Sequence, residues 1–176
     1  MEAKARHGET VQDAVATEGA SFVVFFENEW PRLFRALLLM TANKQEAEDL
    51  TQGAFLKLLE RWETLDHATD LEGYLFRTAL NDYRSLYRRS KLAAKRALTP
   101  GRAEADPFEL VAERESAVRL LLGLTRRQRE AVILTGVEGM NYQQAGELLG
   151  VKESTVRSLV AQARARFTKE METRDG

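Results

Sequence analysis

The chain has 176 residues, of which 44% are hydrophobic and 30% charged, as is typical of one or two globular domains. It contains no cysteine, which excludes disulfides and thiolate zinc sites. The formal net charge of −1 hides an uneven distribution, because 46–72 and 104–115 are mainly acidic whereas 77–96 is strongly basic. No apolar run reaches membrane-spanning length, so we expect a cytoplasmic protein.

Breaks in the helical pattern divide the first half of the chain into an arm and a domain. Residues 1–20 are polar and aperiodic, which predicts a disordered N-terminal arm. Three helical patterns follow and predict a first domain at 21–97. These helices are expected at 21–40, 43–62 and 70–95. Pro31 is expected to bend or interrupt the first of them, because proline has no backbone N–H to donate.

A second break separates a second domain. Residues 98–107 contain two prolines and a glycine among polar residues, which is typical of a linker. The helical pattern resumes in 108–171, the expected second domain, and 172–176 forms a tail. No alternating strand pattern occurs, so the predicted fold class is all-α, with two small helical domains joined by a flexible linker.

The second predicted helix has one clear core-facing stripe. Its members are Ala47, Leu50, Ala54, Phe55, Leu58 and Trp62. Leu56 falls on the opposite side, near Asp49 and Gln52, and is expected to be exposed. Single exposed leucines are common on protein surfaces, so Leu56 alone is weak evidence of a partner site.

The third predicted helix carries a basic stripe. At roughly 100° per residue, a row of charged and amide side chains falls within an arc of about 80°. The members of this basic stripe are Arg77, Asn81, Arg84, Arg88, Lys91 and Lys95. The stripe suits the spacing of phosphates, and Tyr74 beside it is placed to stack on an unpaired base. A solvated face is the alternative, but no carboxylate lies on the stripe, which favours nucleic acid.

The second domain contains the signals of a helix-turn-helix. Two pairs of residues have the spacing of a capping box, which marks a helix start. These pairs are Thr125 with Gln128 and Asn141 with Gln144. Gly150 falls at the tight turn, where a positive φ is needed, and Gly146 falls where the two helices must approach closely.

The last predicted helix has two different faces. The buried face is expected to comprise Val156, Val160, Ala163 and Phe167, with Leu159 at its edge. The opposite face comprises Ser154, Ser158, Ala161 and Ala165, flanked by Arg157 and Gln162. Small residues allow close approach to DNA, while Arg and Gln side chains can bond to base edges. This pattern predicts a recognition helix for the major groove.

Three segments together resemble the extracytoplasmic-function (ECF) sigma factors of the bacterial sigma-70 family. These segments are 46–58, 74–81 and 124–166, in the order and spacing of that family. The resemblance implies that the first domain, region 2, binds the β′ clamp helices of core RNA polymerase and opens the minus-ten element. It implies that the second domain, region 4, reads the minus-thirty-five element and touches the polymerase β flap.

The resemblance also implies roles for individual residues. The polymerase-binding residues would be Asp49, Leu50, Gln52, Phe55 and Leu56. At the minus-ten element, the loop with His67 would capture a flipped base, with contacts from Asn81, Arg77, Arg84, Arg88 and Tyr74. At the minus-thirty-five element, the contacts would come from Lys152, Glu153, Ser154, Thr155, Arg157, Ser158, Gln162 and Arg164. Gly53 departs from the family pattern, which usually has Glu there.

No catalytic, metal or cofactor site is expected. His7 and His67 have no neighbouring ligands at metal-binding spacing, and no phosphate-cradling glycine loop occurs. The partners implied by the resemblance are core RNA polymerase, promoter DNA and an anti-sigma factor, with no membrane insertion. Two alternatives remain open: a stand-alone helix-turn-helix regulator that binds duplex DNA, and a decoy that binds only polymerase or an anti-sigma protein.

Overall fold

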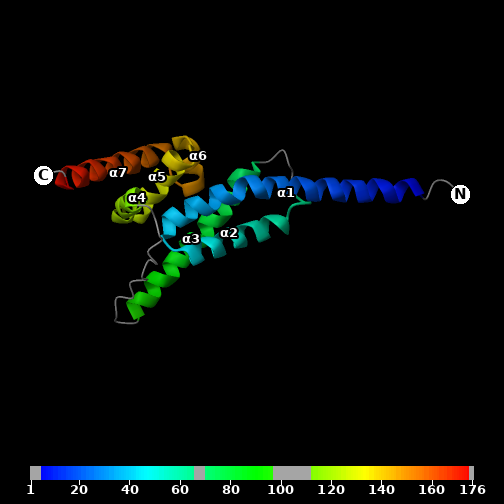
Figure 1. Ribbon diagram of the computed structural model, residues 1–176, viewed down its shortest axis with the longest axis horizontal. Helices are drawn as coiled ribbons and strands as arrows, with labels where there is room; N and C mark the ends of the chain where they lie inside the picture. Colours follow the sequence, from blue (N-terminus) through cyan, green and yellow to red (C-terminus); the bar gives the residue numbers. More distant parts are fainter. Residues whose placement is uncertain (1–4, 66–69, 97–111, 175–176) are drawn as a thin grey trace.

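The computed structural model describes the backbone of residues 5–65, 70–96 and 112–174, and the regular structure there is entirely helical (Figure 1). The predicted all-α fold is thereby confirmed. The elements are α1 (Ala5–Thr41), α2 (Lys44–Leu59), α3 (Leu71–Arg96), α4 (Ala112–Gly123), α5 (Arg126–Val132), the π-helix η1 (Ile133–Val137), α6 (Tyr142–Leu149) and α7 (Glu153–Arg174). None of the described helices has both the length and the apolar character that crossing a bilayer requires.

Helices α1, α2 and α3 form the first domain, with α2 lying along α1 and α3 packed against α2 (Figure 1). The predicted core stripe of α2 is confirmed, because all six of its members are buried. They meet an aromatic cluster on α1, in which Phe26 and Trp30 both contact the ring of Phe55. Burial of these large rings is the main source of stability for the three-helix core.

Local caps separate the three helices of this domain. Helix α1 ends before Ala42, which has a positive φ of 53°. The Asn43 side chain then accepts a hydrogen bond from the backbone N–H of Glu46 at 3.1 Å and starts α2. Asp70 caps α3 in the same way, accepting from the N–H of Gly73 at 2.8 Å. A Cβ at Gly73 would meet the Asp70 carboxylate, so a larger residue at this position would displace the capping side chain.

The prediction of a disordered arm at 1–20 was wrong for residues 5–20, which belong to α1. This segment has no proline, and four of its residues are alanine, the strongest helix former, so it can extend a helix that packing has already nucleated. Helix α1 also continues through Pro31 without interruption. Pro31 is exposed, so water can satisfy the carbonyl that loses its helical donor. The expected linker at 98–107 and residue His67 lie outside the described residues.

Helices α4 to α7 and η1 form the second domain. Its core is built by apolar residues of η1, α6 and α7, namely Ile133, Leu134, Ala145, Leu148, Leu149, Val156, Val160 and Ala163. The π-helix was not predicted. In η1 the N–H of Glu138 donates to the carbonyl of Ile133 at 3.0 Å, which inserts one extra residue into the turn. One inserted residue is too small a change to show in a helical hydrophobic pattern.

Candidate nucleic-acid and partner interfaces

Both predicted capping boxes are present in the second domain. The Asn141 side chain accepts from the N–H of Gln144 at 2.9 Å, and the Gln144 side chain accepts from the N–H of Asn141 at 3.0 Å. Thr125 and Gln128 make the same reciprocal pair at 3.3 and 3.1 Å. The starts of α5 and α6 are therefore set by local side-chain chemistry, as the sequence indicated.

The two glycines of the predicted turn have the conformations expected of them. Gly150 ends α6 with φ 66° and ψ 36°, a left-handed conformation that glycine adopts without strain. A Cβ at Gly146 would lie 2.8 Å from the backbone oxygen of Val151, too close for any other residue without a shift. Together they bring α7 across α6 in a helix-turn-helix.

The two predicted faces of α7 are confirmed by burial. Val156, Val160 and Ala163 are buried, whereas Leu159 and Phe167 are partly buried at the edge. The predicted outward-facing residues Ser154, Ser158, Ala161 and Ala165 are all exposed. The exposed surface at the start of α7 also includes Lys152, Glu153, Thr155 and Arg157, while Arg164 is exposed two turns later.

Neighbouring side chains orient the hydrogen-bonding groups of α7. The Arg157 guanidinium lies 4.9 Å from the ring centroid of Tyr142 and 2.6 Å from a Glu153 carboxylate oxygen. The Gln162 amide donates to Ser158 at 3.2 Å and accepts from Gln128 of α5 at 3.1 Å. Arg157 is thus held on the outward face by stacking, which limits the entropy lost when it meets a ligand.

The second domain covers one member of the basic stripe of α3. Arg77, Asn81 and Arg88 are exposed, but Arg84 is only partly exposed and donates to the backbone oxygen of Leu148 in α6 at 3.3 Å. Burial lowers the pKa of the Arg84 guanidinium. Sequence reasoning missed this, since a contact between residues 64 positions apart leaves no periodic signal.

Tyr74 and Asp82, which lie beside the basic stripe, both interact with other residues of the first domain. Tyr74 is half-buried and packs against the core of the first domain, so only part of its ring is available for stacking. Asp82, the one carboxylate that interrupts the basic run, is 2.7 Å from the Lys57 ammonium of α2. This ion pair neutralises Asp82 and leaves the positive character of the stripe intact.

The five proposed polymerase-binding residues of α2 fall into two groups. Asp49, Gln52 and Leu56 are exposed, and the Leu56 side chain is left 60% accessible. Leu50 and Phe55 are buried in the core, with 8% and 3% exposure. The buried pair can therefore support the exposed surface but offers little direct contact area.

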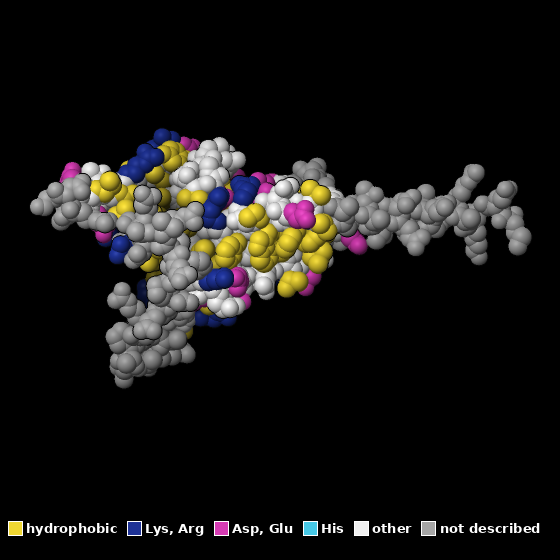
Figure 2. Space-filling view, in the orientation of Figure 1, with side chains coloured by type: hydrophobic (Ala, Val, Ile, Leu, Met, Phe, Trp, Pro, Cys, Tyr) yellow, Lys and Arg dark blue, Asp and Glu magenta, His cyan; other side chains and the backbone are white. Residues whose placement is uncertain are grey.

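An apolar groove lies next to Leu56, between α1 and α2. It has a volume of about 400 Å³ and is lined by Phe22, Phe26, Trp30, Gln52, Phe55, Leu56 and Leu59. Figure 2 shows hydrophobic side chains gathered over this part of the molecule. Sequence reasoning missed Leu59, which is 50% exposed. The spacing of Leu56 and Leu59 by three residues was the available signal, because such residues share a helix face. Within the described residues, no group of three or more acidic or histidine side chains is placed to hold a metal ion.

Comparison with protein families identifies both domains. The family described as "Sigma-70 region 2" matches residues 25–92, and the family described as "Sigma-70, region 4" matches residues 114–167. These matches fall on the first and second helical domains respectively. Each domain of the chain is thus recognised independently of the other.

Relatives and solved structures agree with these matches. The chain is 32% identical over 132 residues to the RNA polymerase sigma-E factor of Streptomyces antibioticus, covering 74% of this chain and 73% of the relative. It is 29% identical to the ECF RNA polymerase sigma factor EcfG of Rhodopseudomonas palustris, covering 78% of each. Its fold is similar to that of the sigma factor RpoE of Bartonella quintana, solved with the anti-sigma factor NepR, with a TM-score of 0.73 and 22% identity. That alignment covers 86% of this chain and 97% of RpoE.

Proposed function

Because this chain belongs to the extracytoplasmic-function sigma factors of the sigma-70 family, we propose that its two domains contact different parts of one transcription complex. As a sigma factor, it binds core RNA polymerase and promoter DNA. Catalysis belongs to the polymerase in this proposal, and the sigma factor supplies binding energy that selects a promoter and offsets the cost of opening it. It acts where the polymerase is, in the cytoplasm.

The main support for the proposed polymerase contact is the apolar groove beside Leu56. Two leucines of α2, Leu56 and Leu59, remain at least half exposed although a large aromatic surface lies next to them. Exposed apolar side chains that line a groove are typical of a surface that receives an amphipathic helix. Asp49 and Gln52 lie exposed on the same helix and supply polar contacts at its edge. The clamp helices of the polymerase β′ subunit are the proposed occupant.

The basic stripe is proposed to hold the minus-ten region. Arg77 and Arg88 are exposed on α3 and are placed to contact backbone phosphates. Asn81 lies exposed between them and can bond to the edge of a base that has left the stack. Tyr74, Arg84 and His67 complete the proposed set, with His67 outside the described residues.

The outward face of α7 is proposed to read the minus-thirty-five element. Arg157 and Gln162 can make paired hydrogen bonds to base edges in the major groove. The remaining proposed contacts at the start of the helix are Lys152, Glu153, Ser154, Thr155 and Ser158, with Arg164 on a phosphate. We also propose that this second domain contacts the polymerase β flap, as the family to which the chain belongs implies.

Control by a separate anti-sigma factor is the last part of the proposal. The related RpoE of Bartonella quintana was solved with such a protein, NepR. A regulator of this kind would have to cover the α1–α2 groove, because that groove is the proposed site of polymerase binding.

Transcription in vitro with purified core polymerase and fragmented genomic DNA tests the proposal. We expect discrete start sites that share upstream minus-ten and minus-thirty-five elements. Core binding without transcripts would indicate a decoy, and DNA binding without core binding would indicate a stand-alone regulator. The double variant Leu56→Ser/Leu59→Ser should weaken core binding, whereas Met171→Ser, at a similarly exposed residue far along α7, should not.

A further inference from the structure

A series of three hydrogen bonds connects the start of α5 to the outward face of α7. The backbone N–H of Thr125 donates to Gln128 Oε1 at 3.1 Å. Gln128 Nε2 donates to Gln162 Oε1 at 3.1 Å, and Gln162 Nε2 donates to Ser158 Oγ at 3.2 Å. Gln128 is buried, whereas Gln162 and Ser158 are exposed. This series, the amide relay, therefore runs from the inside of the second domain to the surface proposed to face DNA.

The direction of the amide relay is fixed at its buried end. A backbone N–H can only donate, so the oxygen of the Gln128 amide must be the group that faces Thr125. The Gln128 nitrogen, which can only donate, then faces Gln162. In the same way the Gln162 amide is turned so that its nitrogen faces Ser158. No amide can reverse alone, because reversal would place two donors or two acceptors in contact.

The amide relay determines which hydrogen-bonding group Ser158 presents. A hydroxyl has one proton and two lone pairs, so accepting a bond from Gln162 leaves the proton for another partner. Other hydroxyls of the described helices, such as those of Ser90 and Thr168, donate to the carbonyl oxygen four residues earlier. Ser158 is instead held as an acceptor by a side chain of its own helix. Because it lies exposed in the second turn of α7, its proton can be donated to a base edge.

We propose that the amide relay makes Ser158 a hydrogen-bond donor that selects a base of the minus-thirty-five element. This inference rests on the proposed function, in which α7 lies in the major groove. Guanine and thymine present only acceptors there, whereas cytosine presents an amino donor. The natural chain should therefore prefer guanine or thymine over cytosine at the base that Ser158 faces. In this selection Gln128 and Gln162 are positioning residues, because they act through the Ser158 hydroxyl.

The substitution Gln128→Glu reverses the amide relay without removing the helix cap. A capping box accepts either Glu or Gln at this position, so the bond from the Thr125 N–H is retained. The second carboxylate oxygen can only accept, so the Gln162 amide must turn over and donate to it. Ser158 then donates to Gln162 and presents its lone pairs to the DNA.

Binding of the holoenzyme to a promoter library, with all four bases at each minus-thirty-five position, tests this reversal. The affinity ratio of guanine or thymine to cytosine should fall about five-fold or more in Gln128→Glu at one position. Helical circular dichroism should be the same as for the natural chain. Ser158→Ala should remove the preference at that position. Equal weakening at all four bases by Ser158→Ala would indicate a phosphate contact and overturn the inference.

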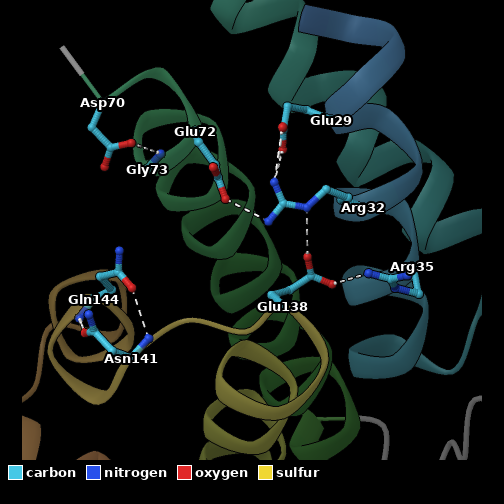
Figure 3. A network of polar contacts seen from close by, with 9 residues as sticks. All are labelled: Glu29, Arg32, Arg35, Asp70, Glu72, Gly73, Glu138, Asn141 and Gln144. Carbon is cyan, nitrogen blue, oxygen red and sulfur yellow. Dashed lines mark hydrogen bonds and ion pairs between the residues drawn. The ribbon is translucent and has the colours of Figure 1, made fainter. Parts of the chain in front are cut away.

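A second variant reaches the reversed state without changing the buried residue. In Gln162→Glu the new carboxylate accepts from both Gln128 and Ser158, so the base preference should shift in the same direction. Its charge weakens binding to all sequences alike, so the ratio between bases is the quantity compared. Gln144→Glu is the matched control, because it makes the same change in the capping box of α6, where the side chain bonds to Asn141 (Figure 3). It should leave the preference unchanged.

The remaining outcomes separate this inference from the proposed function. Adding Ser158→Ala to Gln128→Glu should abolish the shift, and a shift that persists would assign the preference to Gln162 and overturn the role of Ser158. An unchanged preference in both Gln128→Glu and Gln162→Glu would overturn the amide relay while leaving α7 as the reading helix. A natural holoenzyme with no base preference anywhere in the minus-thirty-five element would reject the proposed role of α7 itself, and the inference with it.

Discussion

Arg129 of the second domain caps the last turn of α1 in the first, because its Nη1 donates to the carbonyl oxygen of Met40 at 2.8 Å. The last turn of α1 has no basic residue of its own, so the cation that favours this helix end comes from the other domain. Arg129 also donates to the backbone oxygens of Leu121, Leu122 and Leu124 at the end of α4. One side chain therefore joins two helix ends.

Arg129→Ala is expected to destabilise the protein by about 2 kcal/mol, because it removes a charged donor that four backbone carbonyls of two helix ends share. Urea unfolding followed by circular dichroism would measure the loss. Arg127→Ala, at the exposed neighbouring position, is the control and should change stability by less than about 0.5 kcal/mol. Equal effects of the two changes would contradict the capping role.

Glu130 should make stability depend on pH. Burial raises the pKa of its carboxyl above the ordinary 4.5, with Arg126 and Arg84 opposing the rise. The folded state then holds the proton more tightly than the unfolded state, so the contribution is present below pH 4.5 and lost as pH rises through the folded pKa. The unfolding free energy of the natural chain minus that of Glu130→Gln should therefore fall from about pH 4.5 toward neutrality. A difference that rises over this range would show that the folded pKa is lowered.

Gly146→Ala should disturb the helix-turn-helix. The new Cβ would meet the Val151 oxygen at 2.8 Å, and this backbone atom can move only if α7 shifts. A cost of about 1–3 kcal/mol is expected from the overpacking, together with weaker DNA binding. Gly136→Ala has open space around its Cβ and should be nearly neutral in thermal unfolding.

Two arginines of α7 should affect DNA binding differently. Arg157→Ala is expected to cost about 1–3 kcal/mol at the preferred promoter and to relax the base preference at one position. Arg164→Ala should weaken binding to all sequences alike and reduce its salt dependence. Binding of the holoenzyme to a library of minus-thirty-five variants at two salt concentrations separates these effects. Identical binding profiles for the two variants across the library would show that Arg157 does not read a base.

Gly53→Ala should stabilise α2. Nothing lies within 4 Å of the position of the new Cβ, and alanine is favoured over glycine inside a helix by about 1 kcal/mol. Thermal unfolding would show the gain. Core polymerase binding should be retained, since Leu56 and the groove are left in place.

The sequence by itself determined those features that depend on neighbours along the chain. The capping pairs at Thr125 and Asn141, the turn glycines, and the buried stripes of α2 and α7 were all predicted correctly. Each depends on a spacing of three or four residues, which is the range over which a helix places side chains together.

Only the tertiary structure decided which of the candidate residues are accessible. Arg84 looked like its neighbours on the basic stripe, but α6 of the second domain covers part of it and its guanidinium donates to the Leu148 carbonyl. The meeting of Glu138 with Arg35 joins residues 103 positions apart through a π-turn. Such contacts depend on how whole helices dock, and no local periodicity records that geometry. Sequence chemistry thus determined the surfaces, and packing between the domains determined which of them are available.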